Sequence, residues 1–389
     1  MQSKTKLVII HNLISPHPTP LFKELSRKYN LTVFYCAERE KNRIWEEQPK
    51  GLNYKILPSF SIRFWGKDLF TYFINLTIIS ELERLKPDVV VCAGWDIFAY
   101  QAAFIYCKLK GINFILWSGS TKYEKSWRRS ISLPLVKTIV KGSDAYVAYG
   151  TRAKEYLVSL GANPQKIFIS FNTTNLEKYQ RLSGGFRKNK LKIRKQIGVI
   201  NDRVVLFYGQ LIERKGVGEL LRAFKKVSFF VPHARLLVVG SGRQKEAYLK
   251  LAKSIGLGRI TFLEDPGDEK VCKYYAIADI LVAPSLEEVW GLVVNQAMAS
   301  GLPVIVSKKC GSSADLVKDK WNGLIVNPKN RNELSSSIIR LLKSPGLRKT
   351  FAYRSRSLLK NFRPEVTVRG FNSAINASLK RTPLSRGSG

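Results

Sequence analysis

Residues 279–307, which read DILVAPSLEEVWGLVVNQAMASGLPVIVS, constrain the fold more than any other stretch of the chain. An apolar run at 280–283 has the composition of a buried strand, and Pro284 interrupts it. Small and apolar residues then recur at helical spacing over 291–299, and a glycine and a proline end that helix before a second apolar strand at 304–306. This order of elements predicts a β-α-β unit of a parallel sheet.

The loop of this unit carries two adjacent carboxylates, Glu287 and Glu288. It leaves the carboxyl end of a strand and precedes a helix, which is where open α/β sheets bind ligands and where exposed amides attract anions. Glutamates at this place could instead favour the helix dipole by about 0.3–1 kcal/mol. We prefer that second interpretation for Glu287 and expect a functional role for Glu288.

The stretch resembles the donor-site signature of the family 4 retaining glycosyltransferases (group 1 glycosyl transferases). In that signature two glutamates have seven residues between them, and a small-residue helix and a Gly-x-Pro-Val strand follow. Glu288 stands at the first glutamate position and Gln296 at the second. The resemblance implies an α/β chain of the GT-B fold, with two Rossmann-like parallel-sheet domains facing across a cleft. It is specific only between about residues 204 and 326.

The length and composition agree with such an organisation. A chain of 389 residues with 45% apolar content suits two α/β domains. We predict an acceptor-binding domain at 1–180, a basic linker at 181–203 and a nucleotide-sugar-binding domain at 204–365. A tail at 366–389 could cross back to the first domain. The linker is predicted because its residues are polar and basic and include two adjacent glycines.

A second candidate element precedes the signature. A strand at 204–208 leads into a turn that begins at Gly209, and the turn contains Arg214 and Lys215. Its amides and two cations would form a cradle for a diphosphate, with charge-assisted hydrogen bonds of roughly 1.5–3 kcal/mol each. The two cations could also be a solvated turn. Family members usually have an arginine after the first glycine, where this chain has Gln210.

Two more strand exits lie beside this cradle in the predicted sheet. Gly240 begins a Gly-Ser-Gly turn after a strand at 235–239. Leu263 ends a strand at 260–263, whose exit holds the nucleobase in relatives. We therefore include Gly240 and Leu263 among the candidate donor-binding residues.

The resemblance also implies the role of each residue. Glu288 would bind a sugar hydroxyl, and Gln296 would bind the ribose diol. The negative charge of the departing diphosphate would be stabilised without a metal. The side chains of Arg214 and Lys215 would supply the cations, and Gly291 and Leu292 would supply backbone amides. Because glutamine offers one donor and one acceptor where glutamate offers two acceptors, we expect weaker ribose binding, and restoring glutamate should preserve or raise donor affinity. In the family's same-face substitution a donor phosphate oxygen takes the acceptor proton.

Polar residues also follow predicted strands of the amino-terminal half. His11 follows a strand at 7–10, Asp96 follows one at 88–93, and Ser118 and Ser120 follow one at 112–117. These four residues are the candidates for acceptor contact, since parallel strands place their carboxyl ends at one edge of a sheet. His11 could instead be a solvated loop residue, and Asp96 could cap the helix that follows it.

The net charge of +36 favours anionic partners. No nucleic-acid-binding motif is present, whereas an anionic membrane surface contributes about 1 kcal/mol per nearby cation. Residues 122–141, which alternate basic and apolar side chains, are the best candidate for that surface, although a core-facing helix with a solvated basic side fits equally. The longest apolar run, at 69–79, is too short to span a bilayer, and no signal peptide is evident. We expect a cytoplasmic protein on the inner face of the membrane.

These inferences predict a hexosyltransferase that moves a sugar from a nucleoside diphosphate sugar to a glycan or lipid-linked acceptor, as in cell-surface polysaccharide or lipopolysaccharide synthesis. Gln296 and Gln210 leave open a catalytically inactive, glycosyltransferase-like scaffold. A sugar-nucleotide epimerase of related fold is a further alternative. No metal and no other cofactor is expected, and no nucleic acid partner.

Overall fold

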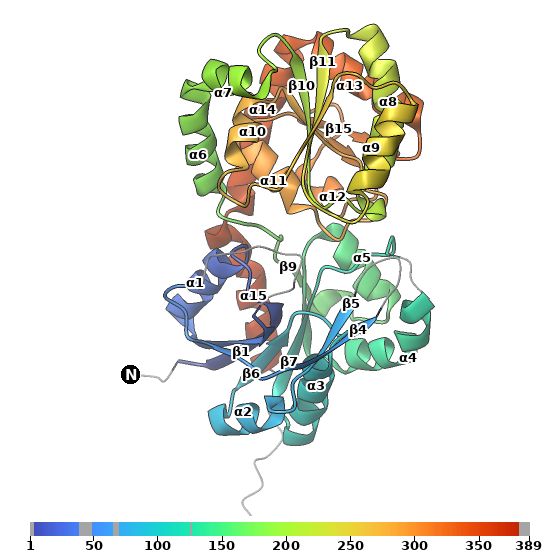
Figure 1. The fold of residues 1–389 in the computed structure, drawn as a ribbon. Helices are drawn as coiled ribbons and strands as arrows, with labels where there is room; N and C mark the ends of the chain where they lie inside the picture. Colours follow the sequence, from blue (N-terminus) through green and yellow to red (C-terminus); the bar gives the residue numbers. More distant parts are fainter. Residues whose placement is uncertain (1–3, 39–48, 65–69, 125–126, 381–389) are drawn as a thin grey trace, which may run out of the picture. The chain divides into compact units, whose positions relative to one another are not determined.

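The chain forms two compact units in a computed structural model that describes residues 4–38, 49–64, 70–124 and 127–380 (Figure 1). The first unit comprises Met1–Asn172 and Pro364–Gly389, and the second comprises Thr173–Arg363. Each unit has its own parallel sheet, so the predicted pair of Rossmann-like α/β domains is confirmed.

The first unit contains a seven-stranded parallel sheet, a two-stranded hairpin and helices. Its strands are β1 (Lys6–Leu13), β2 (Asn30–Ala37), β3 (Tyr54–Ile56), β4 (Phe60–Phe64), β5 (Phe70–Ile74), β6 (Val89–Cys92), β7 (Asn113–Ser118), β8 (Ala145–Ala148) and β9 (Ile167–Ile169). Its helices are α1 (Thr19–Lys28), α2 (Ile78–Leu85), α3 (Phe98–Lys110), α4 (Trp127–Gly142), α5 (Thr151–Ser159), the short η1 (Pro164–Lys166) and α15 (Pro364–Leu379).

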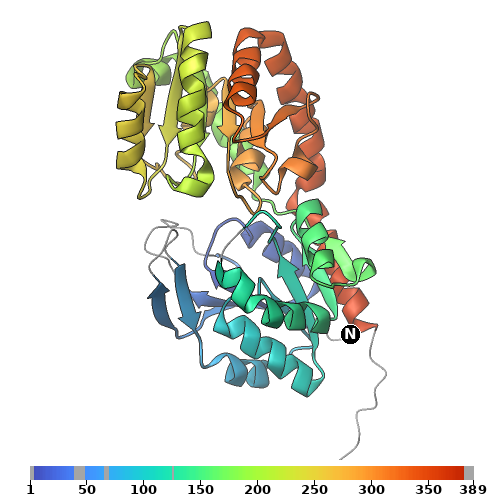
Figure 2. The same ribbon diagram turned by 90° about the vertical axis from the view of Figure 1, so that its right-hand side faces the viewer.

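The strands of this sheet follow the order β3-β2-β1-β6-β7-β8-β9, and β4 pairs antiparallel with β5 outside it. Successive residues of β1 enter different cores: Val8 and Ile10 pack with α2, α3, α4 and α5, while Leu7 and Ile9 pack with α1 and α15. Figure 2 shows the blue-green helices of the first unit along one face of the sheet. Because both faces are covered, β6 and the middle of β1, residues 7–10, consist of buried apolar residues.

The second unit contains a six-stranded parallel sheet. Its strands are β10 (Arg203–Tyr208), β11 (Ala234–Val239), β12 (Ile260–Leu263), β13 (Ile280–Ala283), β14 (Val304–Ser307) and β15 (Gly323–Val326). Its helices are α6 (Leu176–Lys188), α7 (Lys190–Ile197), η2 (Glu213–Lys215), α8 (Val217–Phe230), α9 (Lys245–Ser254), α10 (Cys272–Ile277), α11 (Leu292–Ala299), α12 (Ser313–Leu316), α13 (Arg331–Lys343), α14 (Pro345–Leu359) and η3 (Lys360–Phe362).

This sheet has the order β12-β11-β10-β13-β14-β15, and all of its pairs are parallel. Helices α8, α9 and α13 bury their apolar sides in one core with the sheet. Helix α11 connects β13 to β14, whose register pairs Leu281 with Val304. The β-α-β unit expected from residues 279–307 is therefore confirmed.

The expected linker at 181–203 is wrong, because most of these residues form the helices α6 and α7 of the second unit. Their polar composition has a physical cause: each helix buries few side chains, among them Tyr179 and Arg194, and leaves the rest to solvent. The two adjacent glycines lie inside α6. The boundary between the units lies at Asn172, and the chain returns to the first unit at Pro364.

Two further properties of the described residues concern membrane spans and cysteines. Within them, no helix is long and apolar enough to cross a bilayer. The five cysteines, Cys36, Cys92, Cys107, Cys272 and Cys310, are all free and buried.

The packing of α15 on β9 makes a prediction about Gly370. A methyl group at this position would lie 2.2 Å from the carbonyl oxygen of Ile169, a contact that the backbone can relieve only by moving. We expect Gly370→Ala to lower the free energy of unfolding by about 1–3 kcal/mol, measured by urea denaturation. Gly185 is the matched control, since it lies inside α6 with open space around it, and Gly185→Ala should stabilise by about 0.5–1 kcal/mol. Equal behaviour of the two variants would contradict close packing of α15.

Candidate functional site

Three of the predicted donor residues lie in a row at the carboxyl edge of the second sheet. Gly209 follows β10, Gly240 follows β11 and Leu263 ends β12. The amide of Gly240 donates to the carbonyl of Leu263 (2.9 Å), and a Cβ at Gly240 would lie 1.9 Å from the carbonyl oxygen of Gly209. Only glycine permits this approach, so the spacing of the row depends on it. Gln210 is half-buried beside the row, and its carbonyl accepts from the amide of Ile212 (3.1 Å).

Glu288, Lys215 and Arg214 form a partly shielded ionic cluster at the same edge. The ammonium of Lys215 donates to Oε2 of Glu288, and the guanidinium of Arg214 lies 3.9 Å from Oε1. The exposed fraction is 11% for the Glu288 side chain and 18% for Lys215. The predicted sugar-binding carboxylate and the predicted diphosphate-binding cations are thus in direct contact.

The pKa of Glu288 lies below its usual value. Burial alone would raise it, but the charges of Lys215 and Arg214, the hydrogen bond from Lys215 and one from the backbone amide of Val289 together lower it by more. Glu288 is therefore ionised at neutral pH, and its charge is balanced inside the protein.

The backbone holds the two loops of this cluster together. The amides of Leu286 and Glu287 both donate to the carbonyl of Arg214, at 2.7 and 3.2 Å. Gly216 has a φ of 73°, and a Cβ there would lie 2.1 Å from the carbonyl oxygen of Pro284. The turn after β10 is consequently fixed against the loop after β13, which places the cations beside the carboxylate.

The helix α11 begins next to Glu288. Its N-cap, Gly291, has a φ of 88°, and a Cβ there would lie 3.3 Å from Cγ of Glu288 and 2.7 Å from Sγ of Cys310. Gly291 and Leu292 are half-buried. The two predicted amide donors therefore belong to the same cluster as the carboxylate.

Gln296 is buried in α11, and both ends of its amide have partners. Its Oε1 accepts from the hydroxyl of Tyr275 (2.9 Å), and its Nε2 donates to the hydroxyl oxygen of Tyr179 (2.8 Å). Tyr179 in turn donates to Oδ1 of Asp268. Sequence reasoning missed these three partners, since Tyr179 precedes Gln296 by 117 residues and no motif connects them.

In the first unit, His11 belongs to the strand β1, so the expectation that it lies in a loop after the strand is wrong. Its ring is half-buried among Phe22, Tyr35 and Trp117, and Nδ1 lies 3.0 Å from the carbonyl oxygen of Leu13. Burial lowers the pKa of His11 to about 4, although that hydrogen bond raises it. At neutral pH the ring is uncharged, with Nδ1 donating and Nε2 able to accept.

The other first-unit candidates lie at the ends of β6, which neighbours β1 in the sheet, and of β7, which neighbours β6. Asp96 follows β6 and Ser120 follows β7, but Ser118 is the last residue of β7, so the expectation that it follows that strand is wrong. Asp96 is exposed, and it lies one residue before Ile97, the N-cap position of α3. Ser118 is buried, and its Oγ accepts from the amide of Ser120 (3.2 Å). Ser118 therefore shapes the turn, while Ser120 is half-buried.

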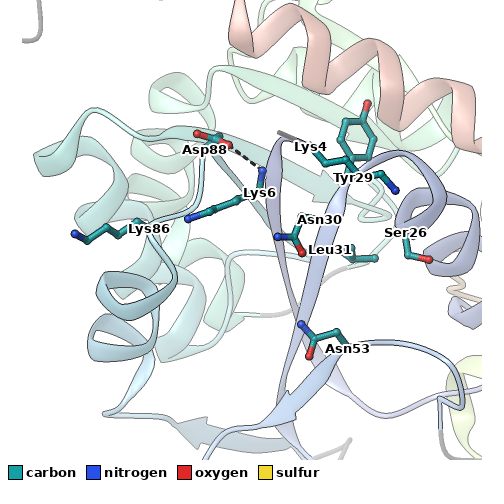
Figure 3. A pocket seen from close by; sticks show the side chains of 9 residues that line it. All are labelled: Lys4, Lys6, Ser26, Tyr29, Asn30, Leu31, Asn53, Lys86 and Asp88. Carbon is teal, nitrogen blue, oxygen red and sulfur yellow. Dashed lines mark hydrogen bonds between the residues drawn. The ribbon is translucent and has the colours of Figure 1, made fainter. Parts of the chain in front are cut away.

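The first unit also has a pocket of about 540 Å³ at the opposite, amino edge of its sheet (Figure 3). The ammonium of Lys4 donates to the carbonyl of Arg27 (3.0 Å), and that of Lys6 to the carbonyl of Leu85 (3.5 Å). These carbonyls end α1 and α2, where the helix dipole is negative. Lys4 and Lys6 thus satisfy helix ends, and none of the predicted site residues lines the pocket.

Among residues 4–38, 49–64, 70–124 and 127–380, no group of three or more His, Cys, Asp or Glu side chains could hold a metal ion.

Residues 189–358 match the family model described as glycosyl transferases group 1. This part of the chain is similar to that family. MJ1607 of Methanocaldococcus jannaschii, an uncharacterised glycosyltransferase, is 32% identical over 199 residues, which are 50% of each chain. The chain spans about half the length of the first curated relatives that it matches.

Two solved structures share the fold of this chain. Anabaena HepE in complex with UDP has a TM-score of 0.75 at 16% identity, covering 96% of this chain and 100% of that chain. The lipopolysaccharide outer core galactosyltransferase WaaB has a TM-score of 0.67 at 17% identity, covering 96% and 99%. The GT-B fold implied by the sequence resemblance is therefore confirmed.

The ionic cluster predicts a pH-dependent effect of Lys215→Met. The wild-type carboxyl has a depressed pKa, so its contribution to stability is present above the unfolded value of about 4.3 and is lost as the pH falls. Without Lys215, a buried charge loses its closest partner, and we expect a loss of about 3 kcal/mol at pH 7–8. The loss should shrink as the pH falls, because the carboxyl of the variant, which lacks its closest cation, takes up a proton first, and the wild-type carboxyl follows only at its lower folded pKa.

Urea denaturation at pH 4 and pH 8 measures this difference. Lys225→Met, which removes an exposed lysine of α8, is the matched control and should have little effect at either pH. A Lys215→Met effect that is the same at both pH values would contradict the pairing with Glu288.

Proposed function

We propose that the chain is a retaining glycosyltransferase that moves a sugar from a nucleoside diphosphate sugar to a hydroxyl of a glycan or lipid-linked acceptor. The observation that carries this proposal is the cluster of Glu288, Lys215 and Arg214 at the carboxyl edge of a parallel sheet, inside the region that matches the group 1 model. HepE, which has the same fold, was crystallised with UDP and with UDP-glucose, and this supports a UDP sugar as the donor.

The cluster suits a reaction in which negative charge develops on a leaving diphosphate. In the proposed step, the bond between the anomeric carbon and the phosphate oxygen breaks, and the acceptor oxygen bonds to the same face of that carbon. The acceptor proton passes to a phosphate oxygen of the departing diphosphate. Lys215 and Arg214 carry two positive charges, of which the carboxylate of Glu288 offsets one, and backbone amides add further donors. We propose that the reaction needs no metal ion. Glu288 would accept a hydrogen bond from a sugar hydroxyl.

The acceptor is proposed to bind at the carboxyl edge of the first sheet. The neutral His11 offers an accepting Nε2, and Asp96 and Ser120 offer exposed or half-exposed polar groups at neighbouring strand ends. Such groups suit the hydroxyls of a glycan. The fold shared with WaaB, which is named as a lipopolysaccharide outer core galactosyltransferase, supports a cell-surface glycan as the acceptor.

Replacing Glu288 tests the proposed reaction. Glu288→Gln keeps the shape but removes the charge that strengthens the sugar hydrogen bond, so we expect transfer to fall about 10- to 150-fold, which corresponds to 1.5–3 kcal/mol. Transfer of radiolabelled sugar from common donors to a membrane extract is the assay. Glu287→Gln at the neighbouring carboxylate should retain activity. Equal losses in the two variants would remove Glu288 from the mechanism, and a wild-type protein that neither transfers nor hydrolyses any donor would favour the inactive scaffold.

We further propose that the protein docks on the inner, anionic face of the membrane through the helices α3 and α4. The prediction from residues 122–141 gains support from exposed apolar side chains on α4, where Ile131 has an exposed fraction of 71%. On α3, Leu109 has an exposed fraction of 80%. Exposed lysines accompany both, including Lys137 and Lys141 on α4. Apolar side chains that project between cations are typical of surfaces that contact anionic lipid.

Sedimentation with liposomes tests this docking surface. The wild-type protein should bind vesicles that contain anionic lipid, and added salt should weaken the binding. Lys137→Glu combined with Lys141→Glu should reduce binding more than Lys250→Glu combined with Lys253→Glu, the same charge change on the exposed side of α9. Binding that is indifferent to lipid charge and to salt would argue against docking.

A further inference from the structure

The partners of Gln296 form a chain of hydrogen bonds that is largely closed to solvent. It runs from Asp268 through Tyr179 and Gln296 to Tyr275, and we name it the Asp268–Tyr275 chain. Tyr179 and Tyr275 are essentially buried, and Gln296 has an exposed fraction of 4%. Its members come from α6, α10, α11 and the segment before α10, so the chain also joins these elements.

The protons of this chain have only one consistent arrangement. A carboxylate can only accept, so the single proton of Tyr179 is directed to Asp268. The oxygen of Tyr179 is then free only to accept, and it must face an N–H group, which is Nε2 of Gln296. Oε1 of Gln296 consequently faces Tyr275, which donates to it. Burial and the nearby Asp268 also raise the pKa of Tyr179, so this hydroxyl keeps its proton.

We propose that Asp268 and Tyr179 are positioning residues that require an amide at position 296 and fix its orientation. A carboxylate at position 296 and the carboxylate of Asp268 would both contact the hydroxyl of Tyr179. That hydroxyl has a single proton and could donate to only one of the two. The amide keeps one further N–H and one further lone pair, which it can offer to a hydroxylated ligand such as a ribose. This last step rests on the proposed function, whereas the match between Asp268 and an amide does not.

The proposal reverses an expectation from the sequence. Because the family signature has a glutamate at this position, restoring it was expected to preserve or raise donor affinity. The hydrogen bonds of Tyr179 lead to the opposite expectation, since Gln296→Glu would break the chain that holds the side chain in place. The departure from the family signature is in this view compensated by Asp268.

The charged and titratable groups around the chain determine how an introduced carboxyl would titrate. Asp268 is the nearest carboxylate along the chain, and Lys178 lies 3.7 Å from its Oδ2 and pairs with Glu269. Cys272 and Tyr208, which donates to Asp265, lie beside Tyr275. Arg187 and Arg356 lie at the other end of α11, near Ser300 and Gly301. Burial and Asp268 would therefore raise the pKa of a carboxyl introduced at position 296.

A raised pKa in the folded state makes a signed prediction. Below the unfolded value of about 4.3 the introduced carboxyl is neutral, can donate to Tyr179 and resembles the amide. As the pH rises above that value, the carboxyl ionises in the unfolded protein but stays neutral in the folded one. The free energy of unfolding therefore falls until the pH reaches the folded pKa, and it does not recover at higher pH. We expect Gln296→Glu to lower the midpoint of thermal unfolding by several degrees at pH 8 and by less at pH 5.

The decisive experiment is a double-mutant cycle on the full chain without nucleotide. It compares wild type, Gln296→Glu, Asp268→Asn and the double variant at pH 5 and pH 8. The double variant exchanges the carboxylate and the amide, so Tyr179 can donate to position 296 and accept from position 268. We expect it to be more stable at pH 8 than Gln296→Glu alone. Asp265 accepts a hydrogen bond from Tyr208 and lies outside the Asp268–Tyr275 chain. Asp265→Asn is therefore the matched control, and its effect on stability should add to that of Gln296→Glu.

The outcomes separate this proposal from the proposed function. Binding of UDP, measured by calorimetry, should weaken about tenfold in Gln296→Glu and recover in the double variant. Additive effects in the cycle, or a Gln296→Glu protein as stable as wild type at pH 8, would overturn the proposal. If Gln296→Glu does not fold, rescue by Asp268→Asn supports the proposal and absence of rescue overturns it. If wild type binds no UDP, the donor assignment fails, while the cycle still decides whether Asp268 requires an amide.

Discussion

The contact between Lys215 and Glu288 is the interaction on which the ligand edge of the second unit depends. A carboxylate with an exposed fraction of 11% is costly to ionise unless a cation lies beside it, and this cation comes from a turn that is 73 residues away in the chain. The two loops can meet only because Gly216 lets the backbone pass close to Pro284. Charge pairing and backbone packing thus both hold the turn after β10 against the loop after β13. The row of strand ends beside these loops results from the parallel order of the strands.

A second polar group, the Asp268–Tyr275 chain, lies around α11 and is built on a different principle. The cluster at Glu288 balances opposite charges, whereas the chain has a carboxylate at its end and otherwise passes neutral donors to neutral acceptors. Its neutral members, Tyr179, Gln296 and Tyr275, tolerate burial because each proton between them has an acceptor, and Lys178 lies 3.7 Å from the carboxylate at the end of the chain. This difference explains how one helix can follow a buried carboxylate, Glu288, and carry a buried amide, Gln296, eight residues later.

Several features of the fold could be predicted because they depend on local sequence. The apolar runs of β13 and β14 and the helical spacing between them specify a β-α-β unit within about thirty residues. The boundary of the units could not be predicted in this way. The helices α6 and α7 are polar and contain two glycines, and they are stable because a few side chains such as Tyr179 pack on α10 and α11. His11 was misplaced for a similar reason, since β1 continues through a polar residue that aromatic rings surround.

By itself the sequence determined the residue types, the order of elements and the candidates Glu288, Lys215 and Arg214, because each follows from patterns over short distances. Only the tertiary structure decided which of these groups are partners. It joined Lys215 to Glu288, and it gave Gln296 two tyrosines and, through one of them, Asp268. The physical reason is that a buried polar atom needs a hydrogen-bond partner in place of water. That partner comes from a segment that is far away in the sequence and is brought near by packing.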